Sequence, residues 1–167
     1  MLYYLWPSYM KEGNEHSEIV VIKHFFIQKI LRINSNVNWP VHPSSNISTP
    51  EKIVRGSRTP GLSRGCHIDG RNGIIFGNNV WIGPHVKIIS MNHHPCDYNE
   101  YIKESPISIG DNCWIGAGAI ILPGVELGNH SIVGAGSIVT KSFPESDQVI
   151  AGNPAKIVKN ISHYSCV

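Results

Sequence analysis

Two adjacent histidines, His93 and His94, lie in a polar segment that reads SMNHHPCDYNEYIKESP. An unperturbed imidazole has a pKa of about 6.5, so either side chain can accept a proton from a hydroxyl group near neutral pH. Asp97 lies close enough in sequence to orient such a base. The sequence therefore offers a candidate general base here, whereas His67, His85 and His130 are expected to be structural.

The segment interrupts a repeat of six residues. From Ile109 the chain reads IGDNCW, IGAGAI, ILPGVE, LGNHSI, VGAGSI and VTKSFP, and the hexads FGNNVW, IGPHVK and IISMNH follow the same frame from Phe76. A period of six fits neither an amphipathic helix nor a strand of a sandwich. It predicts a solenoid of short strands and tight corners, in which three hexads make one triangular coil.

The frame also predicts the core. The first residue of each hexad is aliphatic and should point inward, so that residues 18 apart, such as Ile109 and Leu127, stack on each other. The residue four positions later is small or compact, as a narrow interior requires. Glycine at the second position suits corners that need positive φ or a close backbone approach. The small residues of the first five hexads are Cys113, Ala119, Val125, Ser131 and Ser137.

The frame breaks once. Ile88 and Ile109 are 21 positions apart, which is not a multiple of 18, so we expect a loop excursion over residues 91–106. A polar loop expelled from a regular solenoid is typically functional, although a surface excursion without a role is the alternative.

The two ends differ from the repeats. Residues 19–33 place Ile19, Ile22, Phe26, Ile30 and Ile33 on one helical stripe, which should cap the open end of the solenoid. A helix lying on a membrane surface is the alternative. The expected organisation is an N-terminal segment with its capping helix (1–36), the solenoid (37–154) and a C-terminal helix and tail (155–167).

The overall composition excludes several classes. A net charge of +2 gives no reason to expect a nucleic-acid partner, and no apolar run is long enough for stable membrane insertion. The four cysteines form no CxxC pair, and the N-terminus lacks the order of a signal peptide. We therefore expect a cytoplasmic protein.

The hexads, the histidine-bearing loop, the IGDNCWIGAGAIILPGV run and the closing AGNPAK together resemble the hexapeptide-repeat acyltransferases over about residues 66–160. The likeness is to the branch of galactoside and maltose O-acetyltransferases and surface-polysaccharide acetyltransferases. It implies an all-β fold, a left-handed parallel β-helix, with acetyl-CoA as co-substrate and no metal. It also implies a homotrimer with active sites between subunits, and acetyl transfer to a hydroxyl of a sugar or glycan precursor.

The resemblance suggests a role for particular residues. The family's loop base matches His93, with His94 as the alternative, and its active-site tryptophan matches Trp114. The oxyanion and coenzyme contacts would fall on Ala117, Ala135, Thr140, Lys141 and Lys156. Asp69 and Asn72 are candidates for binding the acceptor, with a turn role equally open.

Three alternatives remain open at this point. An N-acetyltransferase of an amino sugar would use the same donor, and a γ-carbonic-anhydrase-like enzyme would use three histidines around zinc on the same fold. A non-catalytic assembly module would bind no coenzyme. The stretch WPVHPSSNIS and the region 55–64 do not resemble the acceptor-binding region of galactoside enzymes, so the acceptor is open.

Overall fold

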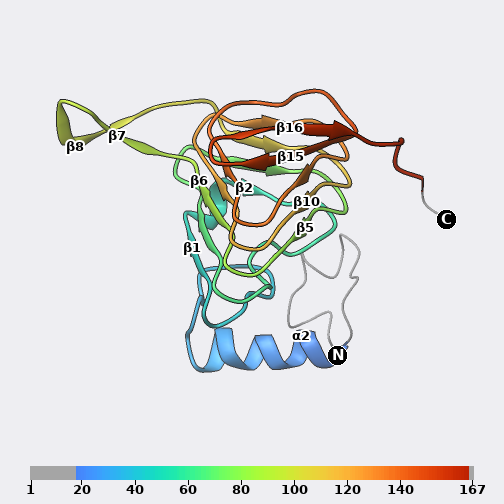
Figure 1. Ribbon diagram of the computed structural model, residues 1–167. Coiled ribbons are helices and arrows are strands. Elements are labelled where there is room, and N and C mark those ends of the chain that lie inside the picture. Colours follow the sequence, from blue (N-terminus) through green and yellow to red (C-terminus); the bar gives the residue numbers. More distant parts are fainter. Residues whose placement is uncertain (1–17, 166–167) are drawn as a thin grey trace.

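A computed structural model describes residues 18–165, and three sheets in it, parallel except for the pair β15 and β16, form the faces of a triangular prism (Figure 1). The chain passes from one sheet to the next and returns to the first after each coil. Residues 1–17 of the predicted N-terminal segment and residues 166–167 of the predicted tail lie outside the described part. The left-handed parallel β-helix expected from the sequence is confirmed.

We call the three faces sheets A, B and C. Sheet A contains β1 (Asn46–Ser48), β3 (His67–Asp69), β6 (Lys87–Ile89), β11 (Ile120–Ile121) and β14 (Ile138–Val139). Sheet B contains β2 (Ile53–Val54), β4 (Ile74–Phe76), β9 (Ile107–Ile109) and β12 (Glu126–Leu127). Sheet C contains β5 (Trp81–Ile82), β10 (Trp114–Ile115), β13 (Ile132–Val133), β15 (Gln148–Gly152) and β16 (Ala155–Asn160).

The six-residue frame sets the register between coils. Ile109 pairs with Leu127 and Ile121 pairs with Val139, so residues 18 apart do lie above one another. The aliphatic positions from Ile109 to Val139 are at most 2% exposed. The small residues four positions later are buried as well, which confirms both predictions about the core.

Glycine at the second hexad position permits a close approach between coils. A Cβ atom on Gly116 would lie 2.6 Å from the backbone nitrogen of Ala135, and one on Gly110 would lie 2.8 Å from that of Asn129. Any larger residue would therefore force the next coil away, and the frame needs glycine here for space.

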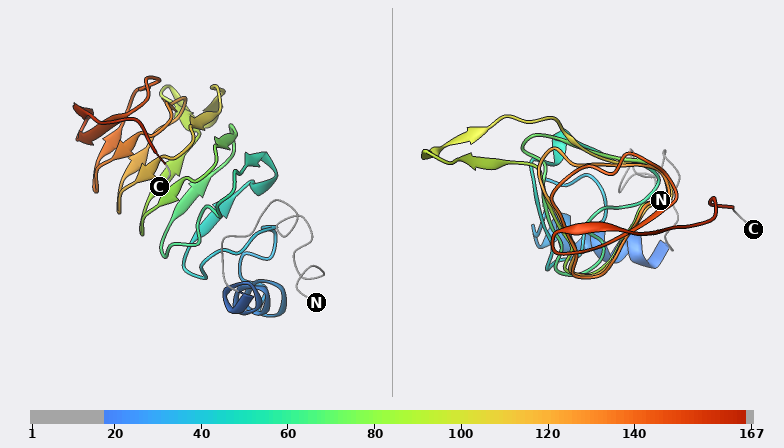
Figure 2. Two further views of the ribbon diagram at one scale, coloured as in Figure 1. Left: turned by 90° about the vertical axis from the view of Figure 1, so that its right-hand side faces the viewer. Right: turned by 45° about the horizontal axis from the view of Figure 1, so that its top comes forward.

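The predicted excursion is a β-hairpin. Strands β7 (Asn92–His94) and β8 (Asp97–Ile102) pair antiparallel and project from the prism (Figures 1 and 2). Because of this insertion Ile88 pairs with Ile121, 33 positions later, instead of 18. The hairpin leaves from the corner between sheets A and B, since β6 precedes it and β9 follows it.

The N-terminal helix forms, but the predicted stripe faces the wrong way. Helix α2 (Glu18–Phe25) continues into a π-helix, η2 (Phe26–Ile30), and lies at the end of the solenoid (Figure 1). The residues of the stripe are between 40% and 77% exposed. Val21, His24 and Gln28 are buried instead, and Gln28 bonds to the backbone of Trp39 and Val41. These hydrogen bonds dock the helix on its more polar side.

The C-terminal helix predicted over 155–167 is also wrong where the structure describes it. The chain turns at Asn153–Pro154, which is a cis peptide, and Ala155–Asn160 return as β16 beside β15. Two β-branched residues, Ile157 and Val158, favour this strand. A 3-10 turn, η3 (Pro50–Lys52), completes the regular elements. The described helices include none long and apolar enough to cross a bilayer.

The carboxylate of Asp147 helps to tie the segment after β16 to the solenoid. Asp147 accepts a hydrogen bond from Nδ1 of His130 at 2.7 Å and another from Nδ1 of His163 at 3.0 Å. These bonds, first that of His163 and then that of His130, lower the pKa of Asp147 below its ordinary value of 3.8. The ionised carboxylate therefore holds the tail.

We expect Asp147→Asn to destabilise the fold in a pH-dependent way. Asparagine keeps the shape of aspartate and tolerates the positive φ of 61° at this position. Because the folded-state pKa is depressed, the wild-type advantage should be present above pH ~4 and should vanish as the pH falls through that lowered pKa. Urea unfolding of both proteins at pH 7, 5 and 3 measures this. An equal gap at all three pH values would contradict the role of the charge.

Candidate active site

His93 lies on β7, exposed to solvent, and its ring is held by a backbone carbonyl. The Nδ1 atom of His93 is 2.6 Å from the carbonyl oxygen of Tyr98. Because a carbonyl oxygen only accepts, Nδ1 must carry the proton and donate it. In the neutral ring Nε2 then has a free lone pair, which is the arrangement that a general base needs.

The neighbouring histidine has the opposite arrangement. The backbone N–H of Cys96 donates to Nδ1 of His94 at 3.3 Å. When the His94 ring is neutral, its proton is then on Nε2, and that atom is a donor. Of the two rings, that of His93 therefore presents Nε2 as an acceptor, and that of His94 does not.

Asp69 and Asn72 lie at the corner between sheets A and B, at the base of the hairpin. Asp69 is 3% exposed, and its two oxygens accept hydrogen bonds from the Arg71 guanidinium at 2.8 to 3.0 Å. These bonds raise the pKa of Arg71. The Asn72 amide donates to the carbonyl oxygens of Ser90 and Ile102, at the two ends of the hairpin. Both predicted acceptor contacts thus make hydrogen bonds within the corner.

Trp114 lines a groove on the outer face of sheet C, which we call the tryptophan groove. It pairs in register with Trp81 below it and Ile132 above it, and the two indoles are 54% and 56% exposed. The groove has a volume of about 440 Å³. It is lined by Asn79, Trp81, Asn112, Trp114, His130, Ile132 and Tyr164.

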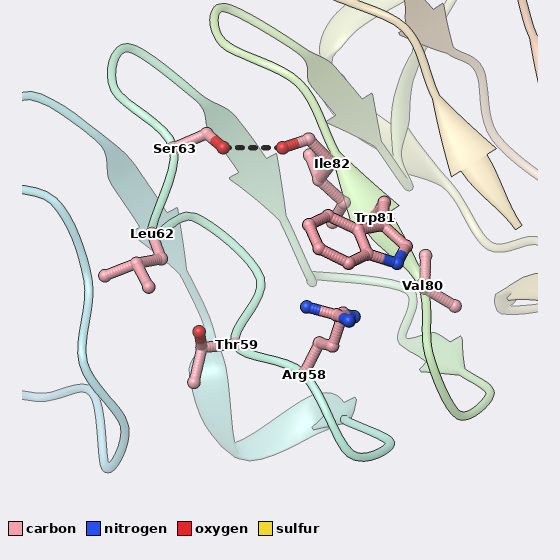
Figure 3. Close-up of a pocket in the computed structure, with 7 residues that line it drawn as sticks. All are labelled: Arg58, Thr59, Leu62, Ser63, Val80, Trp81 and Ile82. Atoms are coloured by element: carbon pink, nitrogen blue, oxygen red, sulfur yellow. Dashed lines mark hydrogen bonds between the residues drawn. The ribbon is translucent and has the colours of Figure 1, made fainter. Parts of the chain in front are cut away.

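The amide of Asn79 fixes one wall of this groove. Its Oδ1 atom accepts hydrogen bonds from the Trp81 indole and from Arg58, both at 3.0 Å, and its Nδ2 atom donates to Asn112 and to the Tyr164 hydroxyl. On the other side of Trp81 is a second hollow of about 230 Å³, where the Arg58 guanidinium lies 3.4 Å above the indole (Figure 3). The Trp81 indole therefore lines both hollows.

The remaining predicted contacts occupy two corners and an edge. Ala117 and Ala135 are exposed and lie in successive coils between sheets C and A. Thr140 and Lys141 follow β14, on the same corner as the hairpin, and the Lys141 ammonium lies 5.6 Å from the Phe143 ring. Lys156 is exposed on β16, at the C-terminal edge of sheet C.

One chain does not bring all of these residues together. His93 projects from the corner between sheets A and B, whereas Trp114 lies on sheet C, the face opposite that corner. Ala117 lies at a third position, between sheets C and A. A site that uses both the histidine and the tryptophan therefore needs two copies of the chain.

The buried cysteines among residues 18–165 are poor nucleophiles. Burial raises the pKa of the Cys113 thiol to about 11 and that of Cys66 above its ordinary value, so both are protonated at neutral pH. Cys96 is exposed on the hairpin. In the same residue range, three or more His, Cys, Asp or Glu side chains nowhere group as metal ligands.

Sequence reasoning missed several residues around these features. Trp81 closes the hexad FGNNVW at the same position where Trp114 closes IGDNCW, so the frame itself identifies the pair. The signal for Arg71 and Tyr101 is weaker, because both lie outside the frame. Tyr164 lies beyond the last hexad, and its contact with Asn79 spans 85 positions.

Comparisons with known proteins agree with this fold. A family model described as the hexapeptide repeat of succinyl-transferase matches residues 106–141. A putative acetyltransferase of Dictyostelium discoideum is 52% identical over 91 residues, covering 53% of this chain and 47% of that protein. The galactoside O-acetyltransferase of Escherichia coli (strain K12) is 41% identical over 99 residues, covering 54% and 48%. The chain thus spans about half the length of these relatives.

Solved structures extend the likeness to nearly the whole chain. A galactoside acetyltransferase in complex with coenzyme A superposes with a TM-score of 0.67 and 28% identity, covering 99% of this chain and 87% of that one. A maltose O-acetyltransferase from Clostridium difficile 630 gives a TM-score of 0.54 and 26% identity, covering 90% and 92%. With its six-residue frame, its three-sheet prism and these relatives, the chain has the hexapeptide-repeat fold and is similar to galactoside and maltose O-acetyltransferases.

Proposed function

We propose that the protein is an acetyl-CoA-dependent O-acetyltransferase that modifies a hydroxyl of a sugar or glycan precursor. Support for the donor comes from the likeness to a galactoside acetyltransferase in complex with coenzyme A. Support for oxygen as the attacking atom comes from the 41% identity to a galactoside O-acetyltransferase. The structural relatives named as N-acyltransferases are less than 25% identical and bear on the fold alone.

The observation that carries the proposal is the hydrogen bond from Nδ1 of His93 to the carbonyl oxygen of Tyr98. It fixes the proton on one ring nitrogen and leaves Nε2 as an acceptor. A sugar hydroxyl is a weak nucleophile until its proton is removed, and a general base typically contributes about 10²–10⁴-fold to such a step. The His93 ring has the tautomer and the solvent access for this task.

The reaction needs no covalent enzyme intermediate. Nε2 of His93 takes the hydroxyl proton as the substrate oxygen forms a bond to the thioester carbonyl carbon. The tetrahedral intermediate then collapses, the carbon–sulfur bond breaks, and the coenzyme thiolate takes the proton back from the imidazolium. The products are the acetyl ester and the free thiol, and the enzyme returns to its starting state.

The oxyanion of the tetrahedral intermediate needs a fixed donor, and we assign this role to the backbone N–H of Ala117. Ala117 is exposed at its corner, and its neighbours Gly116 and Gly118 already donate to Val133 and Pro84. Those bonds hold the backbone rigidly on either side. A preorganised donor at an oxyanion is worth about 10²–10³-fold.

We assign the coenzyme to a path along the corner of Ala117 and Ala135, past the tryptophan groove. Backbone amides in successive coils at this corner suit the amide-rich pantetheine arm. Lys156, exposed at the C-terminal edge of sheet C, suits its phosphates. Thr140 and Lys141, the candidates for contacts at the adenine end, lie on the corner between sheets A and B, so they would have to reach the coenzyme from a neighbouring subunit.

The separation of His93 from Trp114 within one chain supports a site shared between two copies, and we propose that the assembly is a homotrimer. Three prisms around a threefold axis would place the hairpin of one subunit against a neighbour. Each site would then combine His93 of one subunit with Trp114 and Ala117 of the next.

We expect His93→Ala to lower kcat by about 10²–10⁴-fold, the usual contribution of a general base, and to leave acetyl-CoA binding unchanged. His94→Ala should retain nearly normal turnover, because Nε2 of His94 is a donor in the neutral ring and cannot accept the hydroxyl proton. Free thiol release with a panel of sugar and amino-sugar acceptors measures kcat, and calorimetry measures coenzyme binding.

The opposite result, with His94→Ala inactive and His93→Ala active, would transfer the role to His94. Transfer to amino groups alone would favour the N-acetyltransferase. Zinc at one ion per subunit together with no thiol release would replace the proposal with the carbonic-anhydrase alternative. A protein with neither transfer nor coenzyme binding would be an assembly module.

Mixing two inactive variants tests whether the site is shared. Trimers that combine His93→Ala subunits with Trp114→Ala subunits contain some sites with both residues intact, provided that the two residues come from different chains. We expect dissociation and reassembly of the two variants together to restore a substantial fraction of wild-type turnover. Each variant reassembled alone serves as the control, and no restoration in correctly assembled mixtures would contradict a site that combines His93 of one chain with Trp114 of another.

A further inference from the structure

We propose that Tyr101 and Arg71 are positioning residues for the His93 imidazole. The inference rests on the proposed function, because it concerns the same histidine. It assigns a task to two residues that neither touch the reacting atoms nor belong to the six-residue frame. The link runs from the buried Asp69 carboxylate through Arg71 and Tyr101 to His93.

The first contact lies within the hairpin. His93 on β7 pairs directly with Tyr101 on β8, so both side chains lie on the same face of the two-stranded sheet. Their ring centroids are 4.7 Å apart with an interplanar angle of 40°. The phenol ring therefore covers one side of the imidazole and restricts its rotation.

The second contact joins the hairpin to the solenoid. The guanidinium carbon of Arg71 lies 5.0 Å from the centroid of the Tyr101 ring, within the range of a cation–π interaction. The Asp69 side chain, 4% exposed, holds this guanidinium by a salt bridge of 2.8 Å and a second contact through Nε. A planar guanidinium gripped in this way has little freedom to move. Arg71 is thus a fixed support for the phenol ring.

The base of the hairpin is tied down independently. Asn72 donates to the carbonyl oxygens of Ser90 and Ile102, and its own backbone N–H donates to the Ser90 hydroxyl. This clamp fixes where the two strands leave the solenoid, but it does not touch His93. Besides its hydrogen bond to the Tyr98 carbonyl, the imidazole is therefore oriented by the stack of Tyr101 and Arg71.

The physical need for such a support follows from the position of the histidine. His93 is exposed on a strand of three residues, beyond the coils whose packing orients other side chains. Without the phenol ring, the imidazole can rotate away from the Tyr98 carbonyl. The proton is then no longer confined to Nδ1, and Nε2 is less often available as the base.

The experiment compares Tyr101→Ala, Tyr101→Phe and Arg71→Met with Glu100→Ala, a matched control at an exposed neighbouring position of β8. Tyr101→Ala should lower kcat by about 10- to 100-fold, the scale of a misplaced catalytic group, with little change in the KM for acetyl-CoA. Tyr101→Phe keeps the ring and should therefore retain most of the wild-type kcat. Glu100→Ala should match the wild type.

A double variant tests whether Arg71 acts through Tyr101. If it does, Arg71→Met should lower kcat alone but should add nothing to Tyr101→Ala. Independent, multiplying losses would overturn this part of the proposal.

An NMR measurement keeps the inference separate from the proposed function. The ¹⁵N shifts of the His93 ring, recorded above its pKa, report which nitrogen carries the proton whether or not any acceptor is turned over. We expect the Nδ1–H form in the wild type, in Tyr101→Phe and in Glu100→Ala, and a shift toward Nε2–H in Tyr101→Ala. An unchanged tautomer and unchanged kcat in a folded Tyr101→Ala protein would refute the positioning role. If the wild type transfers no acetyl group but Tyr101→Ala still changes the tautomer of His93, only the proposed reaction is refuted.

Discussion

The stacking of each coil on the next is the constraint on which the structure depends. Backbone hydrogen bonds run from coil to coil, as from Gly116 to Val133 and from Gly110 to Leu127, so each frame position lies above its counterpart. The interior of the prism is narrow, because each hexad contributes one aliphatic and one small side chain to it. An insertion into the repeat can therefore be accommodated only by projecting outward at a corner. The hairpin of residues 92–102 leaves at such a corner, and Ile88 and Ile121 close the stack behind it.

This constraint explains which parts could be predicted from the sequence. The strands, the inward residues and the excursion all follow from counting in sixes, because a slip of one residue would turn the whole core outward. The capping helix does not obey the frame. Its apolar stripe suggested a buried face, but Gln28 satisfies the backbone of Trp39 and Val41, and these long-range bonds decide which side docks. No periodicity in the sequence encodes such a pairing.

The candidate site was predictable to a similar extent. The frame identified the hairpin as the irregular element, while the resemblance selected Trp114, the alanine corner and the histidine that would act as base. The sequence could not distinguish His93 from His94, because their difference depends on whether a carbonyl oxygen or an N–H group faces Nδ1 of the ring. Asp69 and Asn72 showed a similar limit. Their residue types suit a sugar ligand and a corner equally well, and the structure reveals partners in Arg71, Ser90 and Ile102.

A rigid prism and a projecting hairpin make different demands on the residues that do chemistry. Backbone N–H groups at the corners of the prism are oriented by the stack itself, so the oxyanion donor proposed at Ala117 would need no support from side chains. A histidine beyond the stack has no such support, since only two short strands hold it. Its orientation must come from side-chain contacts that lead back to the prism. The buried Asp69 carboxylate meets this need, because its salt bridge fixes Arg71 at the corner from which the hairpin departs. The projecting hairpin is thereby coupled to the regular part of the fold through a charge that the solenoid itself keeps buried.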